Sequence, residues 1–214
     1  MPYDLVIFDN DGVLVDSERA ANRILSELLT ACGLPLGPAA CTAAYLGRSL
    51  AAVRADAEGR LGRALPPDFE ARYHDRLFEV FRTALAPVPG VRAALDRIRL
   101  PTCVASSGSH ARIRLTLEVT GLLGRFAGRI FSAEDVARGK PAPDLFLHAA
   151  AALGADPGRC AVIEDSPLGV EAANAAGMTA FGFARLTAPA RLHHARGGVF
   201  RRMAELPALL ERGP

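Results

Sequence analysis

Short apolar runs alternate with longer helical patterns along this chain, an order that predicts a parallel sheet covered by helices on both faces. The expected strands are residues 3–8 (YDLVIF), 102–106 (TCVAS), 129–132 (RIFS), 160–164 (CAVIE) and 179–183 (TAFGF). We therefore expect an α/β fold whose core is a doubly wound, Rossmann-like parallel sheet.

More than ninety residues separate the first two expected strands, which is far too long for a simple crossover. Apolar residues in this gap recur at helical spacing in two stripes. They are Ile24, Leu25, Leu28, Leu29 and Cys32, followed by Gly33, and then Phe69, Tyr73, Leu77, Phe81 and Leu85. We expect residues 16–86 to form an inserted, all-helical subdomain, and residues 1–15 with 87–214 to form the core.

Composition restricts the partners and the compartment. The chain has 214 residues, half of them hydrophobic, so it can bury a sizeable core. Its net charge of +2 is not gathered into a basic block, which argues against nucleic acid or a membrane surface as a partner. The first apolar run, LVIF, is too short for a signal peptide or a membrane span, and we expect a cytoplasmic monomer.

Polar residues follow four of the expected strands. They are Asp9 and Asp11 after the first, Ser106, Ser107 and Gly108 after the second, Lys140 beyond the third, and Glu164 and Asp165 at the end of the fourth. Ligands of open parallel sheets bind outside the carboxyl ends of the strands. Any one of these residues alone is more often a helix cap, a turn residue or a solvated charge. Together they predict four acids, one ammonium and a hydroxyl at one edge.

This combination of groups predicts a cation and a phosphate. Four converging carboxylates repel one another unless a cation neutralises them, and hard oxygen ligands without nearby His or Cys favour Mg²⁺. The hydroxyl of Ser106, the N–H groups of the loop through Ser107 and Gly108, and the ammonium of Lys140 can hold a tetrahedral dianion. Lys140 is the only lysine among 25 basic residues, which suggests a task that needs a compact point charge.

Four segments carry a resemblance to a known superfamily. FDNDGVLVDSE (8–18) resembles the first signature of the haloacid dehalogenase-like phosphohydrolases, in which D-x-D-G-x-L-x-D-[ST]-E follows hydrophobic residues. Ser106 matches the second motif, Lys140 in GKPAPD the third, and Glu164 with Asp165 in IEDSPLGVEAANAAGM the fourth. The chain is identified as a member, similar to the subgroup that contains β-phosphoglucomutase and phosphosugar phosphatases. The insertion after the first motif resembles the superfamily's helical type 1 cap.

The resemblance implies a mechanism for a Mg²⁺-dependent phosphatase of small phosphomonoesters. Asp9 is expected to be the nucleophile that forms an aspartyl phosphate. Asp11 is expected to act as general acid toward the leaving oxygen and then as base toward water. Mg²⁺ is expected to bind Asp9, the main-chain carbonyl of Asp11, and Glu164 or Asp165.

Other functions remain open. Mutases of the subgroup carry a His in the first cap helix and a Lys elsewhere in the cap, but ERAANRIL (18–25) has neither and the cap has no lysine. We therefore favour a phosphatase and keep a β-phosphoglucomutase-like mutase as the alternative. A phospho-accepting receiver module fits less well, because the acids follow the first and fourth strands and the insertion is long. A ligand-binding member without activity is a further alternative.

We expect the inserted subdomain to select the substrate, since the core binds only the phosphoryl group that all candidate substrates share. In YLGRSLAAV (45–53), Gly47 and Arg48 resemble the superfamily's specificity loop. Arg48 could equally be a surface charge. If it faces the site, it suits a second anionic group or a set of sugar hydroxyls, so we expect a phosphorylated sugar or sugar acid.

Two local features follow Lys140. A cis bond between Lys140 and Pro141 could set the direction of the lysine side chain, although base rates favour a trans bond. We expect Asp144 to be the N-cap of the helix that contains LFLHAAAALG, and the C-terminal region with MAELPALL to close the core.

Overall fold

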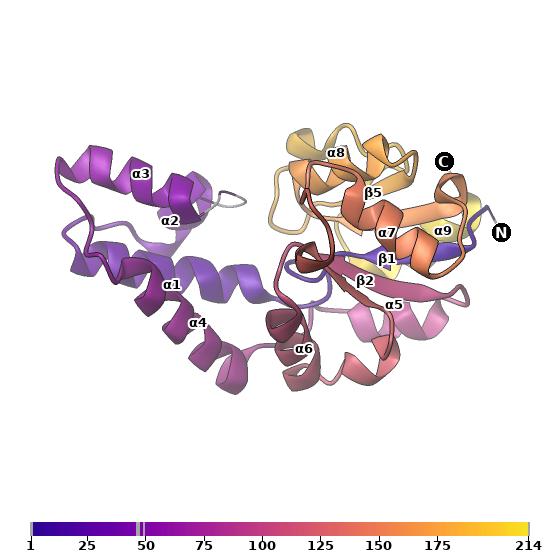
Figure 1. Cartoon of the computed structure of the whole chain (residues 1–214), viewed down its shortest axis with the longest axis horizontal. Coiled ribbons are helices and arrows are strands. Elements are labelled where there is room, and N and C mark those ends of the chain that lie inside the picture. Colours follow the sequence, from indigo (N-terminus) through magenta and orange to yellow (C-terminus); the bar gives the residue numbers. More distant parts are fainter. Residues whose placement is uncertain (1, 46–47, 49, 214) are drawn as a thin grey trace. The chain divides into compact units, whose positions relative to one another are not determined.

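The computed structural model describes residues 2–45, 48 and 50–213, which divide into two compact units. The larger unit comprises residues 1–15 and 86–214, and the smaller unit is Asp16–Leu85. The chain leaves the larger unit after strand β1 (Leu5–Phe8) and returns to it before strand β2 (Thr102–Ser106) (Figure 1).

The larger unit is built on a six-stranded sheet in the order β3-β2-β1-β4-β5-β6, with every pair parallel. The remaining strands are β3 (Ile130–Ser132), β4 (Cys160–Glu164), β5 (Thr179–Phe183) and β6 (Val199–Phe200). The expected Rossmann-like parallel sheet is confirmed. Strand β6 was not predicted, because a two-residue strand leaves no periodic pattern to detect.

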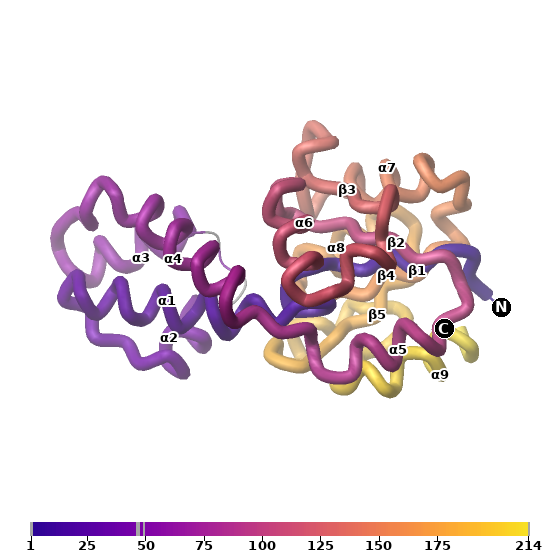
Figure 2. Tube along the Cα trace, turned by 90° about the horizontal axis from the view of Figure 1, so that it is seen from below, coloured from indigo at the N-terminus to yellow at the C-terminus, as the bar shows by residue number. Residues whose placement is uncertain are grey.

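Strand β1 lies at the centre of this sheet, between β2 and β4 (Figure 2). All four of its residues are buried, as an apolar run requires when helices cover both faces of a parallel sheet. Leu5 and Ile7 join the hydrophobic cluster that includes Leu145 and Phe146. The carboxyl end of β1 is therefore held by neighbours on both edges.

Five helices of the larger unit lie beside the sheet. They are α5 (Val91–Arg97), α6 (His110–Val119), α7 (Asp144–Ala152), α8 (Pro167–Ala175) and α9 (Leu206–Arg212). Short 3₁₀ helices span Leu123–Phe126, Ala133–Asp135, Pro157–Arg159, Pro189–Leu192 and Met203–Glu205. Helices α7 and α8 cover one face of the sheet, and α5 and α6 lie on the other (Figure 1).

Two local predictions near Lys140 are wrong. The Lys140–Pro141 peptide bond is cis. Helix α7 begins at Asp144 itself, and Pro143 occupies the N-cap position. The carboxylate of Asp144 instead accepts two hydrogen bonds from the guanidinium of Arg138, at 3.0 and 2.9 Å.

The smaller unit contains the helices α1 (Ser17–Ala31), α2 (Pro38–Tyr45), α3 (Leu50–Leu61) and α4 (Phe69–Ala84). Helix α1 packs against α2 and α4. The buried residues that belong to the predicted stripes are Ile24, Leu25, Leu28, Leu29, Phe69, Leu77 and Phe81. Within the part of the chain that the structure describes, no helix is both long and apolar enough to cross a membrane.

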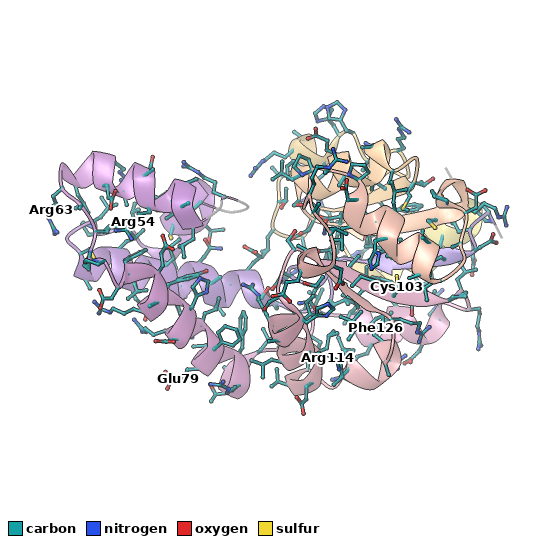
Figure 3. All side chains as sticks on the ribbon, viewed as in Figure 1. Arg54, Arg63, Glu79, Cys103, Arg114 and Phe126 are labelled. Carbon is teal, nitrogen blue, oxygen red and sulfur yellow. The ribbon has the colours of Figure 1, made fainter. Side chains whose placement is uncertain are left out.

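Phe126 offers a test of the core of the larger unit. It is fully buried, with its ring centroid 6.4 Å from that of Phe8 (Figure 3). Phe126→Ala should lower the free energy of unfolding by about 3–5 kcal/mol, because the lost side chain leaves a cavity that the sheet cannot fill. Urea denaturation followed by circular dichroism measures this change. Leu168→Ala, at a side chain that is 47% exposed, is the control and should cost about 1 kcal/mol or less.

Candidate active site

Lys140 is the centre of the polar cluster at the carboxyl edge of the sheet. Its Nζ donates hydrogen bonds to Glu164 Oε1 at 2.6 Å, to Asp9 Oδ1 at 2.7 Å and to the carbonyl oxygen of Ala105 at 3.2 Å. An ammonium carries three N–H donors, so these contacts use all of them. The planar fork of an arginine cannot point its donors at acceptors arranged around one atom. This geometry explains why the lone lysine of the chain stands here.

Asp9 follows β1 and is 7% exposed. Burial raises the pKa of Asp9 to about 7, with the charge of Lys140 opposing this shift and the charges of Glu164 and Asp11 adding to it. Burial also disfavours the charged form of Lys140, but attraction to Asp9 and Glu164 outweighs it and raises the pKa of Lys140 above its ordinary value. Lys140 is therefore a fixed positive charge, and Asp9 is a carboxyl whose ionised form needs support.

Glu164 ends β4, and both of its carboxylate oxygens accept hydrogen bonds from protein groups. Its Oε1 accepts from Lys140, and its Oε2 accepts from the backbone N–H of Ser166 at 3.0 Å and from the Ser166 hydroxyl at 2.9 Å. Gly169 leaves the space for this carboxylate, because a Cβ at that position would lie 1.8 Å from Oε1. These contacts suit a residue that holds the lysine rather than one that binds a metal.

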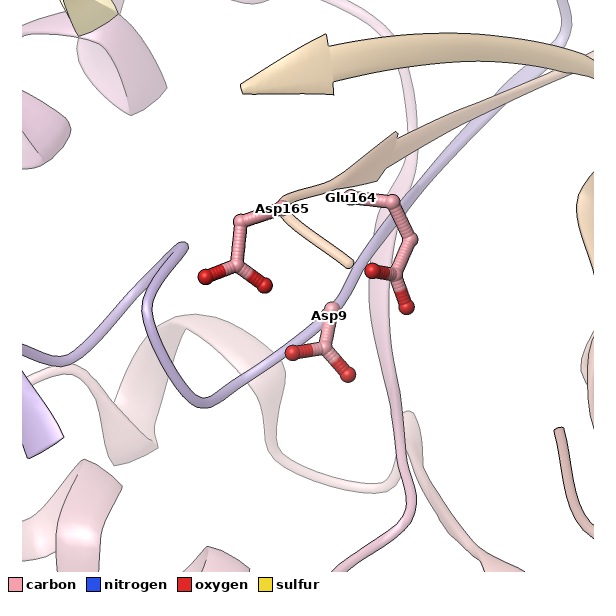
Figure 4. A group of neighbouring side chains, drawn as sticks. All are labelled: Asp9, Glu164 and Asp165. Carbon is pink, nitrogen blue, oxygen red and sulfur yellow. The ribbon is translucent and has the colours of Figure 1, made fainter. Parts of the chain in front are cut away.

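Three carboxylates of this cluster lie close enough together to hold a metal ion. Oxygen atoms of Asp9, Glu164 and Asp165 lie within 4.8 Å of one another (Figure 4). The Asp165 carboxylate lies against Gly12, where φ is +79° and a Cβ would lie 2.1 Å from Oδ2. Since Glu164 already serves Lys140 and Ser166, the carboxylates of Asp9 and Asp165 are the pair best placed for a cation. An all-oxygen set of this kind fits Mg²⁺.

The loop after β2 brings hydroxyl and N–H groups to the same edge. Ser106 is 1% exposed and its Oγ accepts from the N–H of Gly108 at 3.2 Å. The carbonyl of Gly108 in turn accepts from the hydroxyl of Ser132 at 2.7 Å. Ser107 is exposed, and Ser109 caps α6 by accepting from the N–H of Arg112. The bond from Lys140 to the carbonyl of Ala105 joins this loop to the acidic cluster.

Asp11 has a partner that sequence reasoning missed. Nη2 of Arg112, in the first turn of α6, donates to Asp11 Oδ1 at 2.8 Å. The only sequence signal for this contact is a basic residue six positions after Ser106, at the start of a helix that leaves the expected site. Such a position does not distinguish a site residue from a surface charge.

Gly47 and Arg48 are the two residues predicted to select the substrate, and the structure describes only Arg48. Gly47 lies outside the described residues. Arg48 is bound within its own unit: Nη2 donates to the carbonyl of Ala52 at 3.3 Å, Nη1 lies 3.9 Å from Asp56, and the guanidinium lies 5.6 Å from the ring centre of Tyr45. A role of Arg48 toward substrate stays a prediction.

Fold and site together define a class of α/β proteins with an acidic, lysine-bridged site at the carboxyl edge of a parallel sheet. The chain belongs to the haloacid dehalogenase-like hydrolases, whose family model matches residues 3–177. A solved structure of a haloacid dehalogenase-like protein of unknown function from Agrobacterium tumefaciens strain C58 is 35% identical, with a TM-score of 0.93 over 98% of both chains. The predicted superfamily is therefore confirmed.

Relatives with named activities agree with the predicted enzyme class. The chain is 28% identical to 6-phosphogluconate phosphatase of Escherichia coli K12, over 96% of this chain and 94% of that one. It is 33% identical to hexitol phosphatase A of the same organism, over 80% of this chain and 78% of that one. A hydrolase of the family from Deinococcus radiodurans R1, solved with bound phosphate and sodium, is 32% identical with a TM-score of 0.87, over 99% of this chain and 96% of that one. The prediction of a phosphatase is confirmed.

Gly169→Ala tests the lysine-holding role of Glu164. The added Cβ must displace the Glu164 carboxylate from Lys140, so turnover of 4-nitrophenyl phosphate should fall by about 100-fold, as misplacement of a site group by 1 Å can cause. Gly124→Ala is the matched control, because an added Cβ there meets nothing within 4 Å. Thermal melting confirms that both variants are folded. Unchanged turnover in folded Gly169→Ala would contradict this role.

Proposed function

We propose that this chain is a Mg²⁺-dependent phosphatase that hydrolyses small phosphomonoesters through an aspartyl-phosphate intermediate. The observation that carries the proposal is the buried ammonium of Lys140 held between Asp9 and Glu164, with Asp165 beside them. The cluster combines a carboxylate nucleophile, a fixed positive charge and an acidic pair for a cation. A phosphoryl dianion is the reacting group that requires all three.

In the first step a carboxylate oxygen of Asp9 attacks phosphorus while the ester P–O bond breaks. Asp11, in its acid form, transfers its proton to the departing oxygen, and the alcohol leaves. Covalent catalysis by Asp9 divides one difficult displacement into two easier ones.

In the second step a water molecule attacks phosphorus of the aspartyl phosphate. Asp11, now a carboxylate, takes the proton of that water as the bond between the Asp9 oxygen and phosphorus breaks. Inorganic phosphate leaves, Asp9 is again a carboxylate, and Asp11 is again an acid. The same residue thus serves both proton transfers, which restores the starting state without a further group.

The remaining groups of the site would hold the phosphoryl oxygens. The hydroxyl of Ser106 and the N–H groups of Ser107 and Gly108 offer donors from one side, and the ammonium of Lys140 adds its positive charge from another. The contact between Gly108 and Ser106 fixes the direction of the loop before substrate arrives. Donors that are held in place cost little reorganisation during the reaction.

We assign Mg²⁺ to the carboxylates of Asp9 and Asp165 and to the main-chain carbonyl of Asp11. When bound, the cation supplies positive charge that offsets the repulsion between a carboxylate nucleophile and an anionic phosphoryl group. Glu164 contributes indirectly by keeping Lys140 in position.

Phosphorylated sugars or sugar acids are the substrates that we propose. The relatives named as 6-phosphogluconate phosphatase and hexitol phosphatase support this class. We further propose that the smaller unit serves as the cap that selects the substrate, with Gly47 and Arg48 as its specificity residues. A guanidinium suits the carboxylate of a sugar acid or a row of hydroxyls.

Phosphate release from a panel of sugar phosphates and 4-nitrophenyl phosphate tests the proposed function. The wild type with Mg²⁺ should release phosphate, and Asp9→Asn should lower turnover by at least about 1,000-fold because it removes the nucleophile. Chelation of Mg²⁺ should have a comparable effect. Activity that survives Asp9→Asn would remove Asp9 from this role, and conversion of glucose 1-phosphate to glucose 6-phosphate faster than phosphate release would favour a mutase.

Two substitutions separate the proposed metal ligand from the lysine holder. Asp165→Asn should raise the Mg²⁺ concentration for half-maximal activity by at least about tenfold, since a carboxylate ligand is lost. Glu164→Gln should mainly lower kcat and shift the Mg²⁺ requirement much less, because it disturbs Lys140. Magnesium titrations of turnover measure both effects. Asp96→Asn, at a largely exposed carboxylate on α5, is the control; a larger magnesium shift for Glu164→Gln would reverse the two assignments.

A further inference from the structure

Arg112 makes a contact that the proposed mechanism does not yet use. Its Nη2 donates to Asp11 Oδ1 at 2.8 Å, between side chains that are 25% and 18% exposed. An ion pair that is partly shielded from water is screened less than an exposed pair. The contact therefore restrains the Asp11 carboxyl more firmly than a surface pair would.

The stem of Arg112 is itself held by the loop that we assign to the phosphoryl group. The backbone N–H of Arg112 donates to the Oγ of Ser109 at 3.3 Å. Its Cδ and Cγ pass close to Gly108, where an added Cβ would lie 3.4 and 3.7 Å from them. Gly108 is fixed in turn by its bonds to Ser106 and Ser132. The side chain of Arg112 is thus held by the loop after β2, and its guanidinium contacts Asp11 in the loop after β1.

We infer that Arg112 is a positioning residue that orients the carboxyl of Asp11 toward the leaving-group oxygen, an inference that rests on the proposed function. Proton transfer requires the acid to lie within hydrogen-bond distance of the ester oxygen. Asp11 follows β1, whereas the phosphoryl group is gripped by the loop after β2. Arg112 bridges these two loops, so it couples the direction of the acid to the position of the phosphate.

The leaving group distinguishes this role from a merely structural one. A sugar alkoxide needs a proton as the P–O bond breaks, because it is a strong base. A 4-nitrophenolate is a weak base and leaves without one. A residue that positions Asp11 should therefore lower kcat/KM for sugar phosphates and change kcat/KM for 4-nitrophenyl phosphate little, since kcat/KM reports the step in which the leaving group departs and not the later attack of water. A residue that only ties α6 to the first loop should affect both substrates equally.

The experiment compares Arg112→Met with Arg114→Met, a control at an exposed arginine of the same helix (Figure 3). The ratio kcat/KM is measured with 4-nitrophenyl phosphate and with the faster of 6-phosphogluconate and sorbitol 6-phosphate. Arg112→Met should lower kcat/KM for the sugar phosphate by at least about 30-fold, which is part of the 10²–10⁴-fold typical of general acid catalysis. With 4-nitrophenyl phosphate the loss should stay below about threefold. Arg112→Lys should recover part of the loss, and Arg114→Met should match the wild type.

A double-mutant cycle with Asp11→Asn completes the test. In the Asp11→Asn background, Arg112→Met should change kcat/KM for the sugar phosphate by less than about twofold, because the group that it positions is already lost. Equal losses with both substrates, or independent losses in the cycle, would overturn the inference and leave the phosphatase proposal standing. A wild type inactive on both substrates would overturn the proposed function and this inference with it. If melting shows that Arg112→Met is unfolded, Arg112→Gln, which keeps a stem and an N–H donor, takes its place in the same comparisons.

Discussion

One buried ammonium organises the site. The three acceptors of Lys140 come from the ends of three adjacent strands: Asp9 after β1, the carbonyl of Ala105 in β2, and Glu164 at the end of β4. A buried charge is tolerated only when its donors are paired, and loss of one partner leaves an uncompensated charge. The central strands must therefore keep their register for the lysine to be neutralised.

Glycines make room for the carboxylates around this ammonium. Gly169 lies against Glu164 at the start of α8, and Gly12 lies against Asp165 in the turn after β1. In both places a side chain would occupy the volume that a carboxylate needs. The two acids are adjacent in sequence, yet Glu164 faces Lys140 and Ser166 whereas Asp165 faces the turn of Gly12. Their different surroundings are the physical reason to give them different roles.

The carboxylates of the site repel an anionic substrate unless the positive charge beside them offsets their own charge. Burial raises the pKa of Asp9 and the neighbouring acids raise it further, whereas the charge of Lys140 opposes this shift; the cation that we propose would favour the ionised form further. Asp11 lies outside the three-carboxylate group and is paired with Arg112. The proposed nucleophile and the proposed proton donor thus have different cationic partners, Lys140 and Arg112, although only one residue separates them in the sequence.

The sequence by itself determined the parallel sheet, the superfamily and the residues at the strand ends, because apolar periodicity and the order of the motifs are local properties that survive without coordinates. Only the tertiary structure decided what depends on contacts between distant segments. It gave Glu164 and Asp165 different partners, although they are adjacent in the sequence. It also brought Arg112 into contact with Asp11, 101 positions away, and placed Pro143 rather than Asp144 at the N-cap of α7. A carboxylate after a strand looks the same in sequence whether it holds a lysine or a metal ion. Its partners, which folding brings from other strands and helices, make the difference.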